Sequence, residues 1–365
     1  MLNLHEILFS PINDLSRERF IKNYSNLSLF DKKYINRKII SDKLSPIFLE
    51  YLIKKNLEST FDKKGLDNII FQAQRFKIQN LQIIKEVIYL NELFKKENLH
   101  PVFLKGVAIL NEYKDLSLRP MVDIDILFKE DEIFKAYDIL KKNDYKELRF
   151  ESLSKRNLLE FSKNVHHLPE LIGNSNISIE LHHRVTQKYD FKKCPISKSI
   201  FSDSIQIDFF GDKINIPSID WLITHQLIHF SINSKFNNQL RVFYDLKQIE
   251  DNYDINWKSI LSNNKNKKIK RSLLTSIAVI NRNFVILKSF RKAKDSSKYY
   301  FPDDKTIDFY YNKSLQVYEK NLSNFLIDKV DTLIKIFKMK NIFDIFYQIL
   351  SWIKFRIHIF FKLKR

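Results

Sequence analysis

Hydrophobic and polar positions follow two different patterns along this chain. Upstream of residue 100, apolar residues recur at helical spacing, most clearly over 81–99. The same spacing returns after residue 217 and predicts helices over 218–232, 239–252 and 267–284. Both flanks of the chain are therefore expected to be helical.

Between these flanks, short apolar runs bounded by turn residues predict strands. Three of the four glycines and five of the eight prolines lie within 101–217. The predicted elements, in chain order, are a strand in 100–106, a helix over 107–115, a strand over 121–128, a helix over 130–143, a strand over 175–183, and a hairpin around Gly211 in 205–216.

These patterns predict an α/β (α+β) fold, in which a small mixed-sheet core lies between helical regions. We divide the chain into an N-terminal helical region (1–99), the α/β core (100–217), a second helical region on the substrate side (218–330) and a C-terminal amphipathic basic helix (331–365).

The last part of the chain, 342–365, has a pattern of its own. Wound as a helix, its polar residues fall on one narrow stripe, and most other positions are Ile, Phe, Leu or Trp. Such a helix either docks on the protein's own core or makes peripheral contact with a membrane. We expect docking and keep contact with the inner membrane face as the alternative.

Composition adds information about compartment and partners. The single cysteine, Cys194, excludes an internal disulfide and fits a reducing compartment. The N-terminus lacks the pattern of a secretory signal, and no apolar run predicts a transmembrane helix. We therefore expect a cytoplasmic protein. The net charge of +19 accompanies a chain rich in Lys, Asn, Ile and Phe, so we attribute most of it to a solvated surface.

Two aspartates interrupt the apolar run 121–128. Side chains alternate along a strand, so Asp123 and Asp125 point to one face while Ile124 and Ile126 point to the other. Two carboxylates this close repel each other unless a cation lies between them, and Mg²⁺ is commonly held by carboxylates together with substrate phosphates. The alternative is a strand whose outer face is merely hydrated.

Three upstream residues and one downstream carboxylate extend this pattern. Lys105 and Gly106 follow a predicted strand, where a helix N-terminus attracts anions, and Arg119 is suited to binding phosphate oxygens. Each also has a purely structural interpretation: Lys105 as a solvated lysine, and Arg119 as the partner of Asp115. Glu180, on the predicted strand 175–183, is either the polar residue of an amphipathic strand or a third carboxylate of the same site.

The stretch "VFLKGVAILNEYKDLSLRPMVDIDILF" resembles the uncharacterised nucleotidyltransferase family of the polymerase-β-like superfamily. The resemblance extends over about residues 80–285, through "ISIELHHRV" to "LRVFYDLKQI". The superfamily's usual loop has Gly-Ser where Lys105-Gly106 stands here, as in this branch of it.

The resemblance implies a site and a reaction. Asp123, Asp125 and Glu180 would hold Mg²⁺ or Mn²⁺, and Lys105 and Gly106 would cradle a nucleoside triphosphate, with Arg119 nearby. An acceptor hydroxyl would attack the α-phosphate and release pyrophosphate. The acceptor would be a small molecule or a surface-polymer precursor.

The histidines are less informative. If Glu180 faces the site, so does His182, which would either orient the nucleotide or acceptor, or bond to backbone at the core edge. His225 and His229 are interpreted as packing residues or as a wall of the acceptor pocket. Asp245 is expected to pair with Arg241 one helical turn away.

Three other functions remain open. A toxin-type nucleotidyltransferase would modify RNA, but such toxins usually carry Gly-Gly and Arg-x-Ser, where this chain has "KGVA" and "RPMVDID". A glycosyltransferase also uses an Asp-x-Asp pair with a metal, but would not explain the upstream Lys-Gly turn. A non-catalytic binding module would not need all three carboxylates.

Overall fold

The computed structural model describes residues 2–148, 158–159, 162–163, 165–186, 196–237, 240–264, 266–282, 287–290 and 302–315. The C-terminal helix predicted over 342–365 lies outside these residues, so it stays a prediction.

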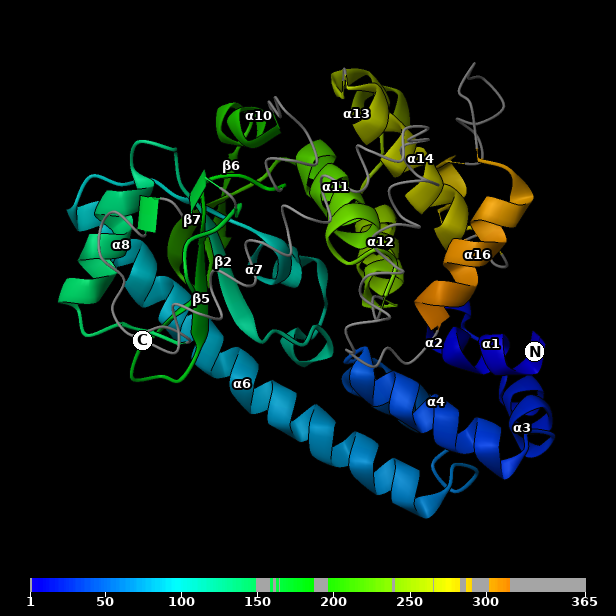
Figure 1. The fold of residues 1–365 in the computed structure, drawn as a ribbon. Helices are drawn as coiled ribbons and strands as arrows, with labels where there is room; N and C mark the ends of the chain where they lie inside the picture. The colour runs from blue at the N-terminus through cyan, green and yellow to red at the C-terminus, as the bar shows by residue number, and fades with distance from the viewer. Residues whose placement is uncertain are drawn as a thin grey trace, which may run out of the picture.

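A seven-stranded mixed sheet forms the centre of the described part of the chain (Figure 1). Its order is β3-β4-β5-β2-β1-β7-β6. β2 runs parallel to β5 and antiparallel to β1, and β1 runs parallel to β7, which confirms the predicted mixed sheet. The strand bounds are β1 Val102–Phe103, β2 Asp123–Leu127, β3 Lys146–Glu147, β4 Leu171–Ile172, β5 Ser178–His182, β6 Ile205–Phe209 and β7 Asp212–Ile216.

Helices precede, interrupt and follow the strands. Their bounds are α1 Leu2–Leu8, α2 Ser10–Asn13, α3 Arg17–Ser25, α4 Leu29–Ser41, α5 Ser45–Lys54, α6 Lys63–Lys96, α7 Lys105–Ile109, α8 Ile133–Lys142, α10 Ile196–Ser202, α11 Ile219–Ile228, α12 Arg241–Asn252, α13 Trp257–Asn263, α14 Lys267–Ile280 and α16 Asp304–Leu315. Two 3₁₀ turns, Leu110–Glu112 and Leu116–Leu118, lie between α7 and β2, and a π-helical turn, His229–Asn233, follows α11.

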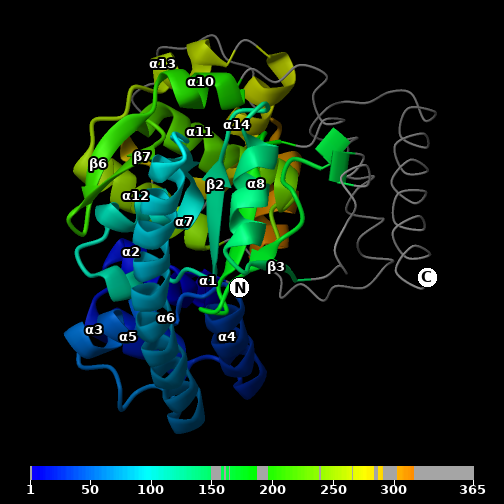
Figure 2. The same cartoon turned by 90° about the vertical axis from the view of Figure 1, so that its left-hand side faces the viewer.

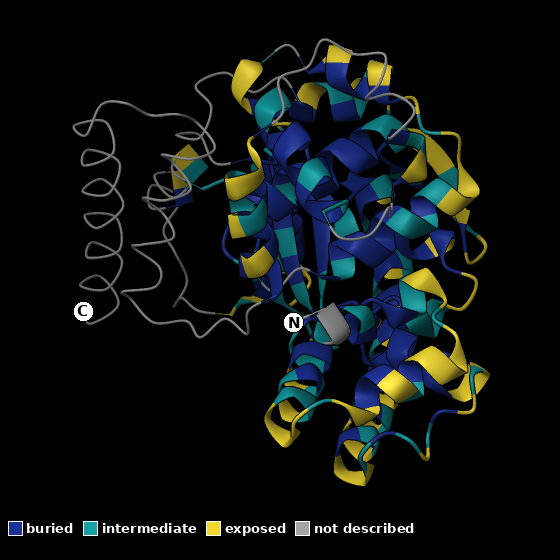
Figure 3. Cartoon of the chain, turned by 90° about the vertical axis from the view of Figure 1, so that its right-hand side faces the viewer, coloured by how far each residue is buried: buried dark blue, intermediate teal, exposed yellow. Residues whose placement is uncertain are grey.

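The helices form layers on the two faces of the sheet (Figures 1 and 2). α8 lies on one face, and α7 on the other, with α11 packed beyond α7. α14 and α16 follow outward from α11, while α6 runs from the N-terminal helices to the sheet. Burial is concentrated in the sheet and in the helices next to it, as Figure 3 shows. Ile124 and Ile126 are fully buried, as the alternation of β2 predicts.

Most predicted elements are present, with different ends. The helix predicted over 81–99 is the last part of the 34-residue α6, whose apolar spacing continues upstream through Ile69 and Phe76. Asp62 caps the N-terminus of α6, and its side chain accepts a hydrogen bond from the Gly65 N–H at 2.8 Å. The hairpin is confirmed, with Gly211 at φ +88° in its turn. Strands β3 and β4 were not predicted, because two-residue strands carry no periodicity.

The division into four regions stays a prediction. No helix in the part of the chain that the structure describes has both the length and the apolarity needed to cross a bilayer.

Asp42, a member of a buried ion pair at the end of α4, connects the N-terminal helices to α12. The Lys38 ammonium lies 3.0 Å from the Asp42 carboxylate, and neither side chain is exposed. The other oxygen of Asp42 accepts a hydrogen bond from the Leu240 N–H at 2.9 Å, directly before α12. Asp42 therefore holds the end of α4 against the start of α12.

We expect Asp42→Ala to lower the free energy of unfolding by about 3–5 kcal/mol, because the Lys38 ammonium would stay buried without its carboxylate. Urea denaturation followed by circular dichroism measures the loss. A Lys38→Met/Asp42→Leu variant removes both charges and should lose less than Asp42→Ala. An equal or larger loss in the double variant would contradict this account.

Candidate active site

The pairing of β2 with β5 brings the predicted carboxylates together. Asp125 lies opposite Glu180 in the parallel register, and Leu127 lies opposite His182. Because side chains two apart on a strand share a face, Asp123, Asp125, Glu180 and His182 belong to one face of the sheet. The prediction that His182 points the same way as Glu180 is confirmed by their contact.

A lysine and a histidine contact the paired carboxylates. The Lys105 ammonium is 2.5 Å from Asp125 Oδ1 and 3.9 Å from the Glu180 carboxylate. The Nε2 atom of His182 is 2.8 Å from Asp125 Oδ1 and 3.2 Å from Glu180 Oε2. Lys105 is thus not a solvated surface lysine but a part of the carboxylate cluster.

Lys105 and His182 shift the pKa values of the carboxylates that they contact. Asp125 is 2% exposed, and burial opposes its ionisation, yet Lys105 and His182 outweigh this and hold its pKa well below the usual value. Burial likewise opposes the ionisation of Glu180, but the hydrogen bond from His182 lowers its pKa. Burial disfavours the charged form of His182, and its bonds to the two carboxylates nevertheless raise its pKa.

Asp123 differs from its neighbours. It is half-buried and, within the described residues, makes no hydrogen bond or ion pair. Burial and the charge of Asp125 raise its pKa. Asp123 is therefore the member of the cluster whose oxygens the protein leaves available.

The turn into α7 combines a left-handed residue, Lys105, with a glycine that allows close approach, Gly106. Lys105, not Gly106, has the left-handed backbone, with φ +47°. A Cβ on Gly106 would lie 3.0 Å from Met121 Cγ, so glycine allows α7 to approach that side chain closely. α7 is only five residues long and continues as a 3₁₀ turn. The roles of Lys105 and Gly106 in holding a triphosphate stay predictions.

Arg119 is buried in an ion pair that the sequence did not predict. Its Nε and a terminal nitrogen donate to the two oxygens of Asp245 at 2.7 and 2.9 Å, and its other terminal nitrogen donates to the Pro120 carbonyl at 2.7 Å. The Tyr113 hydroxyl also donates to Asp245, at 2.7 Å. The expected pair of Asp245 with Arg241 is therefore wrong, and so is the alternative pair of Arg119 with Asp115. Tertiary packing brings together residues 126 apart, which helical spacing does not reveal. Because its guanidinium is engaged, a role for Arg119 in binding nucleotide stays a prediction without support here.

Two adjacent histidines, His166 and His167, also lie near the cluster. The rings of His166 and His167 have centroids 5.3 and 5.4 Å from that of His182. Adjacent residues of a regular strand face opposite ways, but this segment forms only an isolated bridge at His167, so both rings can lie on the side of His182. His183 faces away, with Nε2 2.9 Å from the Val165 carbonyl, as alternation predicts.

Two further cations near Asp123 were missed. Lys43 lies between α4 and α5, and Arg241 begins α12, so both are far from Asp123 in sequence. Burial and the charge of Arg241 lower the pKa of Lys43 to about 8, and Asp123 opposes this shift. Burial and Arg119 lower the pKa of Arg241 to about 10. No local motif contains these residues, so only the tertiary structure identifies them.

The cluster has the composition of a cation site. One ligand atom each from Asp125, Glu180 and His182 lie within 4.8 Å of one another. Carboxylate oxygens suit Mg²⁺, whereas an imidazole nitrogen beside them suits a transition metal such as Mn²⁺ better. The residues present therefore fit a divalent cation.

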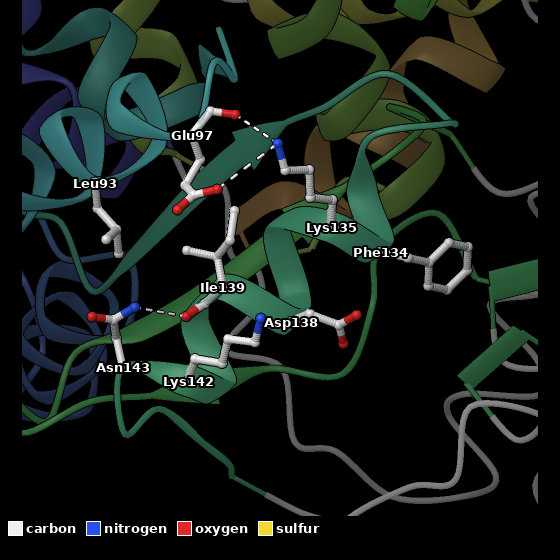
Figure 4. Close-up of a pocket in the computed structure, with 8 residues that line it drawn as sticks. All are labelled: Leu93, Glu97, Phe134, Lys135, Asp138, Ile139, Lys142 and Asn143. Atoms are coloured by element: carbon white, nitrogen blue, oxygen red, sulfur yellow. Dashed lines mark hydrogen bonds and ion pairs between the residues drawn. The ribbon is translucent and has the colours of Figure 1, made fainter.

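A surface pocket of about 350 Å³ lies elsewhere, between the end of α6 and α8 (Figure 4). It is lined by Leu93, Glu97, Phe134, Lys135, Asp138, Ile139, Lys142 and Asn143. The Lys135 ammonium donates to the Glu97 carbonyl at 2.6 Å across its rim. None of the predicted site residues lines this pocket, so we do not connect it with the carboxylates.

The Arg119–Asp245 pair can be tested through stability. We expect Asp245→Ala to lower the free energy of unfolding by about 3–5 kcal/mol, because the Arg119 guanidinium would stay buried without its carboxylate. The control is Asp251→Ala, which removes a carboxylate from an exposed pair with Lys247 and should cost less than about 1 kcal/mol. Urea denaturation measures both, and similar losses would count against the role given to Asp245.

His225 should make the protein sensitive to acid. It is 1% exposed, and burial holds its pKa well below the usual value, so the folded state keeps it neutral where the unfolded state binds a proton. His225 has no such effect on the free energy of unfolding well above pH 6.5. Below that pH it destabilises the protein increasingly, by about 2 kcal/mol at pH 5.

The free energy of unfolding, measured by urea denaturation from pH 7 to pH 5, should therefore fall less steeply in His225→Leu than in the native protein. The exposed His100 provides the control, since His100→Leu should leave the slope unchanged. Equal slopes for His225→Leu and the native protein would refute the prediction.

Comparison with known proteins supplies the family. A solved structure similar to this chain is an antigenic nucleotidyltransferase-like protein from Paracoccidioides brasiliensis, at 14% identity and a TM-score of 0.35 over 58% of this chain and 93% of that one. A similarity at this level carries no argument about the site. No curated protein sequence matches the chain significantly. The profile of the uncharacterised nucleotidyltransferase family matches residues 30–285, more than half of the sequence. The chain therefore belongs to the uncharacterised nucleotidyltransferase family.

Proposed function

We propose that this protein is a metal-dependent nucleotidyltransferase that transfers a nucleoside monophosphate from a nucleoside triphosphate to an acceptor hydroxyl. The acceptor is a small molecule or a surface-polymer precursor. The observation that carries the proposal is the register of β2 and β5, which sets Asp125 opposite Glu180, on the face that Asp123 shares. Membership of the family supports the reaction class.

Asp123, Asp125 and Glu180 are the residues that would hold Mg²⁺ or Mn²⁺, with His182 beside them. When bound, the cation would supply positive charge to the phosphates of the donor and to the charge that develops in transfer. Asp123 supports this assignment, because its carboxylate makes no hydrogen bond or ion pair within the described part of the chain.

The other residues position these carboxylates. Lys105 and His182 keep Asp125 and Glu180 ionised and close together despite their burial. The bidentate pair of Arg119 with Asp245 fixes the segment that enters β2, four residues before Asp123. Glu180 is the candidate acceptor of the hydroxyl proton during attack on the α-phosphate. Catalysis in phosphoryl transfer rests mainly on such positioning and on charge neutralisation.

The alternatives predict different ligands. An RNA-modifying toxin-type enzyme would share the nucleotide donor and differ in its acceptor, and a glycosyltransferase would bind a sugar nucleotide. A cytoplasmic location, and peripheral membrane contact through 342–365, stay predictions of the sequence.

Calorimetry tests the donor site. The native chain should bind one of the four nucleoside triphosphates in the presence of Mg²⁺, and Asp123→Asn/Asp125→Asn should weaken this binding at least about a hundredfold, because two carboxylates next to the cation lose their charge. The matched control is Asp131→Asn/Asp138→Asn, which makes the same charge change on two exposed aspartates and should bind like the native chain.

Metal-dependent binding of a sugar nucleotide instead would support the glycosyltransferase. Binding of no nucleotide, or equal binding by both double variants, would refute the proposal.

A further inference from the structure

The cations that the sequence assigns to phosphate binding are engaged inside the protein. The Lys105 ammonium contacts Asp125 at 2.5 Å, and the Arg119 guanidinium donates hydrogen bonds to Asp245 and to the Pro120 carbonyl. A site that accepts a triphosphate beside three carboxylates needs other positive charges to offset the repulsion. The structure provides two further cations. Within the described residues, neither forms an ion pair with the site carboxylates or with Asp245.

Lys43 and Arg241 are brought together by the contact between α4 and α12. The Asp42 carboxylate accepts a hydrogen bond from the Leu240 N–H at 2.9 Å, and these residues immediately precede Lys43 and Arg241. Lys43 takes a left-handed backbone, with φ +58°, which turns the chain between α4 and α5 at this point.

The contact between α4 and α12 lies next to Arg119 and Pro120, in the segment that leads into β2. One terminal nitrogen of Arg241 donates to the Pro120 carbonyl at 3.1 Å, and Arg119 donates to this same oxygen at 2.7 Å. Two guanidinium groups therefore converge on one carbonyl, three residues before Asp123. Lys43 lies within electrostatic range of Arg241, Arg119 and Asp123.

The three cations at this place, Lys43, Arg119 and Arg241, have fewer carboxylate partners than positive charges. Asp245 uses both oxygens on Arg119. Within the described residues, neither Lys43 nor Arg241 forms an ion pair with a carboxylate. The lowered pKa values of Lys43, about 8, and of Arg241, about 10, both caused first by burial and then by like charges, agree with this imbalance. Both residues are half-buried, so part of each is exposed to solvent.

We propose that Lys43 and Arg241 form a polyphosphate subsite, one that takes the outer phosphates of the donor while its α-phosphate lies at Asp123 and Asp125. The nature of the ligand rests on the function proposed above. A guanidinium forks onto two phosphate oxygens and an ammonium adds a point charge, so a multivalent anion satisfies both groups at once. The residues come from the two helical regions, so the core alone would not complete the site.

The experiment uses inorganic tripolyphosphate and the full chain in a buffer with EDTA, which separates the subsite from any metal. Calorimetry should show binding to the native chain that weakens at least about tenfold in Lys43→Gln and in Arg241→Gln, since each variant loses a charged phosphate contact. Asp123→Asn should bind at least as tightly as the native chain, because a nearby negative charge is removed. Lys54→Gln and Arg75→Gln change exposed cations of the same types and should bind normally.

If Arg241→Gln unfolds, Lys43→Gln alone tests the proposal. Glutamine makes the same demand as lysine on the left-handed backbone at residue 43, and Lys43 forms no ion pair, within the described residues, that the substitution would break. Native binding that is absent, or that stays within twofold in Lys43→Gln, overturns the inference. With Mg²⁺ added, a comparison of inorganic pyrophosphate with the nucleoside triphosphate distinguishes product from donor, and tighter binding of the triphosphate supports the donor.

Failure of the two proposals can be told apart. Suppose that nucleoside triphosphate binding requires Asp123 and Asp125 but tripolyphosphate binding is unchanged in Lys43→Gln. The proposed subsite is then wrong, and the proposed nucleotidyltransferase function is kept. If tripolyphosphate depends on Lys43 and Arg241 but no nucleoside triphosphate binds with Mg²⁺, the anion subsite stands and the proposed donor fails.

Discussion

Asp125 is a carboxylate held at 2% exposure, and its burial requires a cation beside it. Lys105 meets that requirement and His182 adds a second contact, and each depends on a different part of the fold. Lys105 reaches Asp125 because the chain turns left-handed directly after β1. His182 reaches it because β5 is the parallel neighbour of β2 in one particular register. A shift of that register by one residue would turn Glu180 and His182 to the opposite face and leave Asp125 without one of its partners.

Two other buried ion pairs attach the helical regions to this centre. Lys38 with Asp42 sets the end of α4 against the start of α12, and Arg119 with Asp245 sets α12 against the segment that enters β2. Breaking a buried pair is costly because the remaining charge stays out of water. The carboxylate cluster therefore lies where three parts of the chain meet, and the cations Lys43 and Arg241 border it from the helical side.

Much of the core was predictable because its signals are local. The alternation of β2 assigns Asp123 and Asp125 to one face, and the pattern of β5 places Glu180 and His182 together, since strand geometry depends only on neighbouring residues. The hairpin at Gly211 is predictable for the same reason. Strands β3 and β4 were missed because they are too short to show a period.

The sequence by itself determined most of the longer elements, the face of each strand that carries the carboxylates, and the family to which the chain belongs, because periodicity and motif are properties of contiguous residues. The tertiary structure alone decided which charges meet. It paired Arg119 with Asp245 rather than with a close neighbour, placed Lys105 on Asp125, and brought Lys43 and Arg241 near Asp123. Coulombic energy depends on distance in space and on burial, and neither quantity can be read from separation along the chain.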